Sequence, residues 1–460
     1  MNDVAEKVII PIGAMARIPK TLVNMERLRK ILTIVSKDTS GYGEDVKIPL
    51  YIEHYNEVEI PRYYALKIFS SHPNVEFEYS AQDRFMSDFP EFDGKLRPVQ
   101  EKLLPNALEQ ILKDENRGGI LNLAVGAGKT ISALWLASQI KQKTLVIVHK
   151  EFLMDQWIER ILGNPAKGEK AFLPGARVGK IQQNVCDYKD KHIVLGMVHS
   201  LAMKDDYPSE IYNEFGLIIA DELHRLAAAV FSQAMPKFDS LYRVGLSATL
   251  KRKDNTEPVF LHAVGPVVAV HDVENLAPKI KRVYLDEVKL KSGKDPTVMG
   301  QGRLISFIAK NHKRNMIIVD QIVRAVTAGR KIIVMSHRLE QLDALKNLIE
   351  TTLKATGDHL KYSIGKYVGG MPQQQLDISA EKDIILSTYN MTSEGLDVPA
   401  LDTMVFATPM SSVHQSIGRI LRAYDGKKEP VVVDLVDRGV GLCMGMYRKR
   451  LKFYESKNWV

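Results

Sequence analysis

The chain is poor in cysteine and has no long hydrophobic run. Its 460 residues contain two cysteines, Cys186 and Cys443, which lie far apart and form no CxxC pair. This excludes a cysteine-rich zinc site or a disulfide framework and favours a reducing compartment. No apolar stretch approaches the roughly 20 residues of a membrane span, and the first residues lack the basic start and apolar core of a signal peptide. We therefore expect a soluble cytoplasmic protein of a bacterium or phage-infected host, with no membrane partner.

The remaining composition is that of a folded protein with a basic surface. Hydrophobic residues make up 45% and charged residues 26%, which is enough for a substantial core. The length predicts two or three domains. The net charge of +8 favours a polyanionic partner such as a nucleic acid.

Three regions differ in their pattern. Residues 1–90 contain short β-rich segments broken by proline and glycine, which predicts a small α+β accessory domain. In residues 91–275 and again in 276–460, β-rich runs alternate with helical patterns, which is typical of parallel sheets covered by helices. The predicted fold is therefore α/β, with two tandem parallel-sheet units after the small domain. Tyrosines and basic residues of residues 1–90, such as Tyr55, Arg62 and Tyr63, could stack on nucleic acid or could belong to a core and its surface.

The segment Ala124–Thr130 has the features of a phosphate-binding loop. It follows an apolar run and precedes a helical pattern, so backbone N–H groups and a helix N-terminus would surround phosphate oxygens. It departs from the general pattern at Leu123, where glycine is usual. The alternative is an ordinary glycine turn. The residues that we expect at the phosphates and at Mg²⁺ are Gly126, Gly128, Lys129 and, through its hydroxyl on the metal, Thr130.

A second acidic site follows the apolar run Phe215–Ala220. A carboxylate at the C-terminal end of a parallel strand lies where such sheets bind ligands. Asp221 would hold Mg²⁺, Glu222 would position or deprotonate the attacking water, and His224 would link the nucleotide to the rest of the protein. The alternative is that the two acids only begin a helix.

A third element lies near the C-terminus. On a helix, Gln415, Arg419 and Arg422 share one face. Two arginines projecting together suit the charge that develops on a transferred γ-phosphoryl group, as an arginine finger does. The alternative is a solvated basic helix face.

Six motifs, in this order, resemble the motif set of the superfamily 2 helicases, over about residues 95 to 435. They are Leu96–Gln100, Ala124–Thr130, Asp221–His224, Ser247–Thr249, Glu394–Pro399 and Gln415–Arg422. The resemblance implies two RecA-like lobes that bind ATP and Mg²⁺. The tripeptide Arg252-Lys253-Asp254 also resembles the Arg-Glu-Asp element of XPB-type DNA helicases, with lysine at its centre. The small first domain is similar to that of phage branch-migrating helicases of the UvsW type.

The resemblance also implies roles for single residues. Arg97 and Gln100 would recognise adenine, and Ser247 and Thr249 would couple hydrolysis to lobe movement. Gly395 and Asp397 would touch both the nucleotide and the nucleic acid. Residues implied in the strand-binding channel, each of which could equally be an ordinary polar residue at a strand end, are His149, His199, Arg338 and Thr388.

The function implied is ATP-dependent movement along DNA, with unwinding or branch migration of forks and junctions in replication, recombination or repair. Contacts to phosphates predict little sequence specificity. Two alternatives remain open at this point. One is an RNA helicase, and the other is a nucleotide-dependent switch that does not translocate.

Overall fold

The computed structural model describes residues 7–37, 44–113, 115–124, 126–204, 207–250, 252, 254–271, 277–288, 300–394, 396, 398–421 and 426–460. They form two compact units, Met1–Val273 and Glu274–Val460. None of the helices in these ranges is long and apolar enough to cross a membrane.

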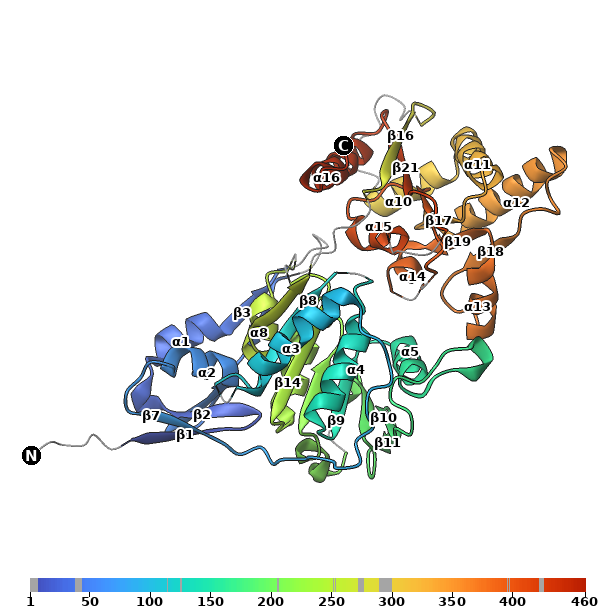
Figure 1. Cartoon of the computed structure of the whole chain (residues 1–460). Coiled ribbons are helices and arrows are strands. Elements are labelled where there is room, and N and C mark those ends of the chain that lie inside the picture. The colour runs from blue at the N-terminus through green and yellow to red at the C-terminus, as the bar shows by residue number, and fades with distance from the viewer. Residues whose placement is uncertain are drawn as a thin grey trace, which may run out of the picture. The chain divides into compact units, whose positions relative to one another are not determined.

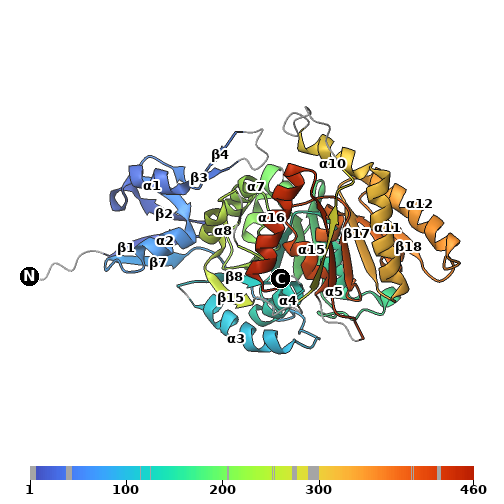
Figure 2. The same cartoon turned by 90° about the horizontal axis from the view of Figure 1, so that it is seen from above.

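The first unit begins with a small mixed sheet of order β5-β6-β2-β1-β7 and a separate two-stranded sheet, β3-β4. Helix α1 starts where the side chain of Asn24 accepts a hydrogen bond from the backbone N–H of Arg27, at 2.9 Å. The elements are β1 (Val8–Ile12), β2 (Met15–Pro19), α1 (Met25–Leu32), β3 (Thr33–Ser36), β4 (Val46–Pro49), β5 (Ile52–Glu53), β6 (Glu57–Pro61), α2 (Arg62–Phe69) and β7 (Val75–Tyr79). In Figure 2 these elements lie together on the side of helix α8 (Glu257–Val264).

Two buried arginines connect this small part to the rest of the unit. Arg62 donates hydrogen bonds to the carbonyls of Ser240 and Leu241, at 2.7 and 3.1 Å. In the opposite direction, Arg243 donates to the carbonyl of Ala14 at 3.0 Å. Burial, together with the nearby Arg62 guanidinium, lowers the pKa of Arg243 to about 9. Arg62 is therefore a structural residue and not an exposed nucleic-acid contact.

Tyr63 is buried as well, and its hydroxyl donates to the carbonyl of Arg117 at 3.0 Å. It therefore belongs to the core. By contrast, the side chain of Tyr55 is 94% exposed, so of these three residues only Tyr55 remains open to a stacking partner.

The main sheet of the first unit has the order β11-β10-β12-β9-β13-β14-β8-β15, and all neighbours are parallel except β10 and β11. Figure 1 shows α3 and α4 lying across one face of it. Its strands are β8 (Gly118–Leu123), β9 (Thr144–Val148), β10 (Val178–Gln182), β11 (Val185–Asp187), β12 (Ile193–Met197), β13 (Leu217–Ala220), β14 (Tyr242–Ser247) and β15 (Val267–His271). Its helices are α3 (Pro98–Leu112), α4 (Lys129–Ile140), α5 (Glu151–Leu162), α6 (Val198–Met203), α7 (Ala228–Ala234) and α8.

Both faces of this sheet are buried, which explains why its strands read as continuous apolar runs. Leu145 and Ile147 of β9 pack with α6, α7 and α8. Val146 and Val148 of the same strand pack with α3, α4 and α5 on the other face. The alternation follows from the two-residue period of a strand.

One histidine lies where α2 packs on α8. The ring of His262 meets that of Tyr64 edge-on, with centroids 5.0 Å apart, and burial lowers the pKa of His262 to about 4. Because the unfolded chain binds this proton near pH 6.5, the stabilisation by His262 is present above that pH and is lost as the pH falls.

The free energy of unfolding should therefore fall between pH 7 and pH 5 in the wild-type protein. We expect this fall to be smaller by about 1 kcal/mol in His262→Phe, measured by urea titration at each pH. An unchanged loss would contradict this assignment.

The second unit is built on a six-stranded parallel sheet of order β16-β21-β20-β17-β19-β18. One face packs on α11 and α12, and the other on α13, α15 and α16. The strands are β16 (Lys279–Leu285), β17 (Ile332–Ser336), β18 (Ile364–Tyr367), β19 (Ile384–Thr388), β20 (Thr403–Phe406) and β21 (Val431–Asp437). The helices are α10 (Gln301–Ala309), α11 (His312–Thr327), α12 (Leu339–Ala355), α13 (Gln373–Glu381), α14 (Tyr389–Glu394), α15 (His414–Ile420) and α16 (Gly441–Ser456).

The predicted fold class, two α/β units with parallel sheets and a small α+β part before them, is confirmed. The predicted boundary near residue 90 falls inside the first compact unit, which runs to Val273. A separate accessory domain of residues 1–90 therefore stays a prediction.

Candidate nucleotide site

The predicted site residues of the first unit converge because their strands are neighbours. β13, β14 and β8 lie side by side in parallel. Asp221 follows the end of β13, Ser247 ends β14, and the Ala124–Thr130 loop follows β8. All three therefore lie at the same edge of the sheet, which is where open α/β sheets bind their ligands.

The loop between β8 and α4 has the backbone of a phosphate-binding turn. Gly126 and Gly128 have φ angles of 84° and 83°, which residues with a side chain rarely adopt. A Cβ on Gly128 would also lie 2.7 Å from Nε2 of Gln100. Helix α4 begins directly afterwards, at Lys129, so its N-terminal N–H groups lie at the loop.

Gln100 and Arg97 contact this loop directly. The Nε2 amide of Gln100 donates to the carbonyl of Gly128 at 3.1 Å and to Oγ of Ser132 at 3.0 Å, while its Oε1 accepts from the backbone N–H of Arg97 at 2.9 Å. The guanidinium of Arg97 donates to the carbonyl of Gly126. The two residues expected at adenine are thus also bonded to the loop expected at the phosphates.

Lys129 and Glu222 form an ion pair across the site. Nζ of Lys129 lies 3.4 Å from Oε1 of Glu222. Glu222 has a φ of 49°, in the left-handed region where a side chain is strained. Strain at such a position is commonly associated with function, here with the acid expected to act on water.

Asp221 is buried beneath this pair. Its Oδ2 accepts from Nε1 of Trp157 at 2.8 Å, and its Oδ1 accepts from the backbone N–H of Glu222 at 2.8 Å. Burial and the neighbouring Glu222 carboxylate raise the pKa of Asp221 to about 6, against these hydrogen bonds. Sequence reasoning missed Trp157, because an indole within the helical pattern of residues 151–162 reads as a core residue.

The donor set fits Mg²⁺. A buried carboxylate with a raised pKa gains from a nearby cation, and oxygen ligands are those that Mg²⁺ prefers. Asp221 would hold the ion together with the hydroxyl of Thr130, which lies in the first turn of α4. When bound, such an ion neutralises phosphate charge during transfer.

His224 connects the acidic box to the end of β14. Its Nδ1 lies 3.2 Å from Oγ of Ser247 and 3.2 Å from Oε2 of Glu222. Because the Ser247 hydroxyl donates to the carbonyl of Thr249 at 2.6 Å, Nδ1 of His224 must carry the proton to donate to Ser247. Burial lowers the pKa of His224 to about 4, so the ring is neutral near pH 7.

The Arg252–Asp254 pair holds the turn that contains His224. Arg252 donates to the carbonyls of Leu223 and Leu226, both at 3.1 Å. Its other guanidinium nitrogens donate to Asp254 at 3.0 and 2.9 Å, and this pairing lowers the pKa of Asp254 to about 2. Lys253, the residue at which the tripeptide departs from the family pattern, lies outside the described residues.

We expect Arg252→Gln to lower the kcat of ATP hydrolysis about tenfold with little change in KM for ATP, because the turn that carries His224 loses two anchors. Steady-state ATPase assays measure both constants, and a urea titration shows whether the fold persists. A large rise in KM with normal kcat would mean that Arg252 supports nucleotide binding instead.

Among the other predicted residues, His149 lies at the same edge of the sheet as Asp221, because β9 pairs in parallel with β13. His149 follows β9, His199 lies exposed on α6, Thr388 ends β19, and Arg338 donates to Oγ of Ser306 at 2.7 Å. Backbone positions of Gln415 and Arg419 fall in α15, but the structure does not describe their side chains. Gly395, Asp397 and Arg422 lie outside the described residues.

Comparison with known proteins matches the same regions. A family model described as "Type III restriction enzyme, res subunit" matches residues 93–252, and the "Helicase conserved C-terminal domain" matches residues 314–424. A "Putative ATP-dependent RNA helicase" of Acanthamoeba polyphaga mimivirus is 33% identical over 96% of this chain and 84% of its own length. The chain belongs to the superfamily 2 helicases. It is therefore a helicase-type ATPase, as its motifs predicted.

Further matches have lower sequence identity. The "Probable helicase D10" of Escherichia phage T5 is 27% identical over 81% of this helicase and 78% of its own length. A fragment of a putative HsdR subunit of a type I restriction enzyme from Vibrio vulnificus has a TM-score of 0.53 at 18% identity, covering 76% of this chain and 66% of that chain. The crystal structure of T4 UvsW covers 98% of this chain and 97% of that chain at 18% identity, with a TM-score of 0.40. Neither structural likeness says anything about the substrate.

Proposed function

We propose that this helicase hydrolyses ATP in order to move along DNA, and that it acts on duplex or branched DNA. The observation that carries the proposal is the convergence of the Ala124–Thr130 loop, Asp221 and Ser247 on adjacent parallel strands. A nucleotide-dependent switch would need the phosphate-binding loop. It would give no role to the side-chain contacts that join Glu222, His224 and Ser247.

In the first step, ATP replaces a protein contact with a ligand contact. Lys129 leaves Glu222, which it pairs at 3.4 Å, and binds the β- and γ-phosphates. Glu222, no longer paired with Lys129, would then orient the attacking water. Binding of adenine at Gln100 and Arg97 would also affect the phosphate-binding loop, because both side chains are hydrogen-bonded to it.

In the second step, the effect of hydrolysis passes from Glu222 to the end of β14, and the second unit supplies arginines for the reaction. A change at Glu222 alters its contact with His224, and His224 passes it to Ser247 and Thr249 at the end of β14. Arg419 and Arg422 supply the positive charge that stabilises the transferred phosphoryl group, and Gln415 contributes a neutral amide on the same helix face. Movement results from the difference in affinity between the two units in each nucleotide state.

DNA is favoured by the first family model, which is named for a restriction enzyme subunit, and by the Arg252-Lys253-Asp254 element and its similarity to DNA helicases. RNA is the second candidate, because the mimivirus relative is named as a putative RNA helicase. Branch migration, as in the UvsW type, rests on the small N-terminal part and the sequence resemblance.

The test is ATPase stimulation and unwinding with matched DNA and RNA substrates. Single strands, blunt duplexes, forks and four-way junctions of one sequence are compared with their RNA counterparts. We expect the largest stimulation with forked or four-way DNA and a steep fall as salt rises. Stronger stimulation by RNA would assign the RNA substrate, and no stimulation by either would leave only the switch.

A further inference from the structure

In the second unit, a short segment joins strand β20 to helix α15. It consists of residues 407–413, and α15 carries Gln415 and Arg419. The position of α15 therefore depends on how this segment leaves the sheet. Its first part, residues 407–410, is hereafter called the 407–410 segment.

Arg314 of α11 holds the beginning of this segment. It is fully buried and forms a two-pronged ion pair with Asp437, the last residue of β21, at 2.7 and 3.0 Å. Its remaining nitrogen donates to the carbonyl of Ala407. Gln341 approaches the same carbonyl at 3.4 Å.

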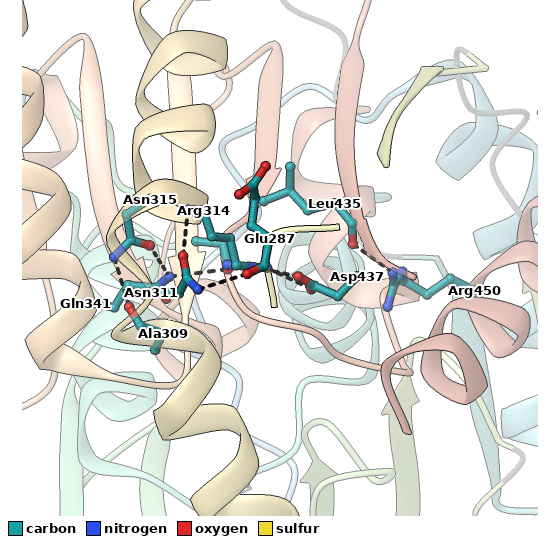
Figure 3. A network of polar contacts seen from close by, with 10 residues as sticks. Glu287, Ala309, Asn311, Arg314, Asn315, Gln341, Leu435, Asp437 and Arg450 are labelled. Atoms are coloured by element: carbon teal, nitrogen blue, oxygen red, sulfur yellow. Dashed lines mark hydrogen bonds and ion pairs between the residues drawn. The ribbon is translucent and has the colours of Figure 1, made fainter. Parts of the chain in front are cut away.

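Arg450 of α16 holds the end of the segment in the same way. It pairs with Asp434 in the middle of β21, at 2.8 and 3.1 Å, and its Nη1 donates to the carbonyl of Met410. Arg450 is 1% exposed. In Figure 3, Asp437 lies between Arg314 and Arg450, which approach β21 from opposite sides.

Thr408, one of the two residues between the anchored carbonyl groups, is held as well. Oγ1 of Thr408 accepts from the backbone N–H of His337 at 2.9 Å, and its carbonyl accepts from the hydroxyl of Tyr389 at 2.7 Å. Beyond the segment, Val413 and Ile417 pack with Tyr454 in the core. The backbone that leads into α15 is thus fixed at three successive points.

These ion pairs are poorly explained by stability alone. Burying two charges costs several kcal/mol of desolvation per ion, and apolar residues of similar volume often stabilise a core as well or better. What apolar residues could not supply is a charged donor aimed at one backbone carbonyl. Both arginines combine a carboxylate partner with such a carbonyl, and both carbonyls belong to the 407–410 segment.

We propose that Arg314 and Arg450 are positioning residues for ATP hydrolysis, which act by fixing the 407–410 segment and thereby the helix that carries Gln415 and Arg419. The proposal rests on the proposed function, in which Arg419 stabilises the transferred phosphoryl group. A displacement of about 1 Å at such a group is enough to lower a rate roughly 100-fold.

The first test is Arg450→Lys in the full chain. Lysine keeps the positive charge beside Asp434, but as a point charge it cannot also reach the carbonyl of Met410. We expect kcat of ATP hydrolysis to fall about 10- to 100-fold, with KM for ATP changed less than about threefold. Unchanged kcat in a folded protein would overturn the proposal. Arg450→Met with Asp434→Leu removes the charges together, and the same loss of kcat is expected if it folds.

A control pair lies at the end of β20 that is opposite the 407–410 segment. Arg330 pairs with Asp402 at 3.5 Å, directly before β20. Arg330→Met with Asp402→Leu should change the urea midpoint but leave kcat within about twofold. An equal loss of kcat in this control would assign the effect to general destabilisation and overturn the proposal.

A double-mutant cycle separates this inference from the proposed function. If Arg450 acts through α15, Arg450→Lys should lower kcat little further in a protein that already carries Arg419→Ala. Full additivity of the two losses would overturn the positioning role. A normal rate for Arg419→Ala alone would instead overturn the proposed role of Arg419, whatever Arg450→Lys shows.

Discussion

Lys129→Ala should reduce kcat of ATP hydrolysis on the order of 10³-fold or more while leaving the protein folded. Lys129 is the cation at the start of α4, between two glycines with positive φ and the Glu222 carboxylate. Without it, the β- and γ-phosphates lose their direct positive partner, and Glu222 loses the group that holds it in the nucleotide-free state. Nucleotide binding and turnover are measured separately, by titration with a fluorescent ATP analogue and by phosphate release.

The same unit offers a closely matched control. Lys143 pairs with Glu214, and these side chains are 10% and 28% exposed, against 10% and 27% for Lys129 and Glu222. Lys143 precedes β9, at the opposite edge of the sheet from the nucleotide site. Lys143→Ala should therefore lower stability without lowering kcat, and normal turnover in Lys129→Ala would dismiss the phosphate-loop assignment.

Arg419→Ala and Arg422→Ala should each lower hydrolysis about 10³-fold, which is the scale of a missing arginine finger. ATP binding by the first unit should persist, because its contacts come from the loop, Lys129 and Gln100. The measurement is single-turnover hydrolysis with saturating enzyme, which reports the chemical step alone.

The control for these arginines is Arg324 on α11. Its side chain is 72% exposed and pairs with Asp320 one helical turn away, at 2.8 Å. Such surface pairs contribute little to stability, so Arg324→Ala should behave as wild type. If Arg419→Ala and Arg422→Ala do so too, the two arginines belong to an ordinary basic helix face.

The sequence predicted the parts of this site that depend on local pattern. The strand–loop–helix order around Lys129 and the acids after a buried strand are readable because glycine, lysine and carboxylates are unusual at those positions. Their convergence could be expected because parallel strands present their C-terminal ends at one edge.

The contacts that support the site could not be predicted, because they join residues far apart in the chain. Trp157 reaches Asp221 over 64 positions, and Arg314 reaches Asp437 over 123. In the sequence Trp157, Arg314 and Arg450 are members of helical segments, and nothing local distinguishes them from a core indole or a surface cation. Only the three-dimensional packing shows that these side chains are buried and which carbonyl or carboxylate each one meets.

The hydrogen bonds that Arg62 and Arg243 each donate to backbone carbonyls of the other part determine how this protein can be divided. Cutting the chain near residue 90 would remove the cation that covers the carbonyls of Ser240 and Leu241 and would leave Arg243 without the carbonyl of Ala14. Both positions adjoin or belong to β14, the strand that ends at Ser247. Shortened or chimeric versions that lack the first 90 residues would thus carry a damaged first unit, and a defect in them would be no measure of what that part recognises.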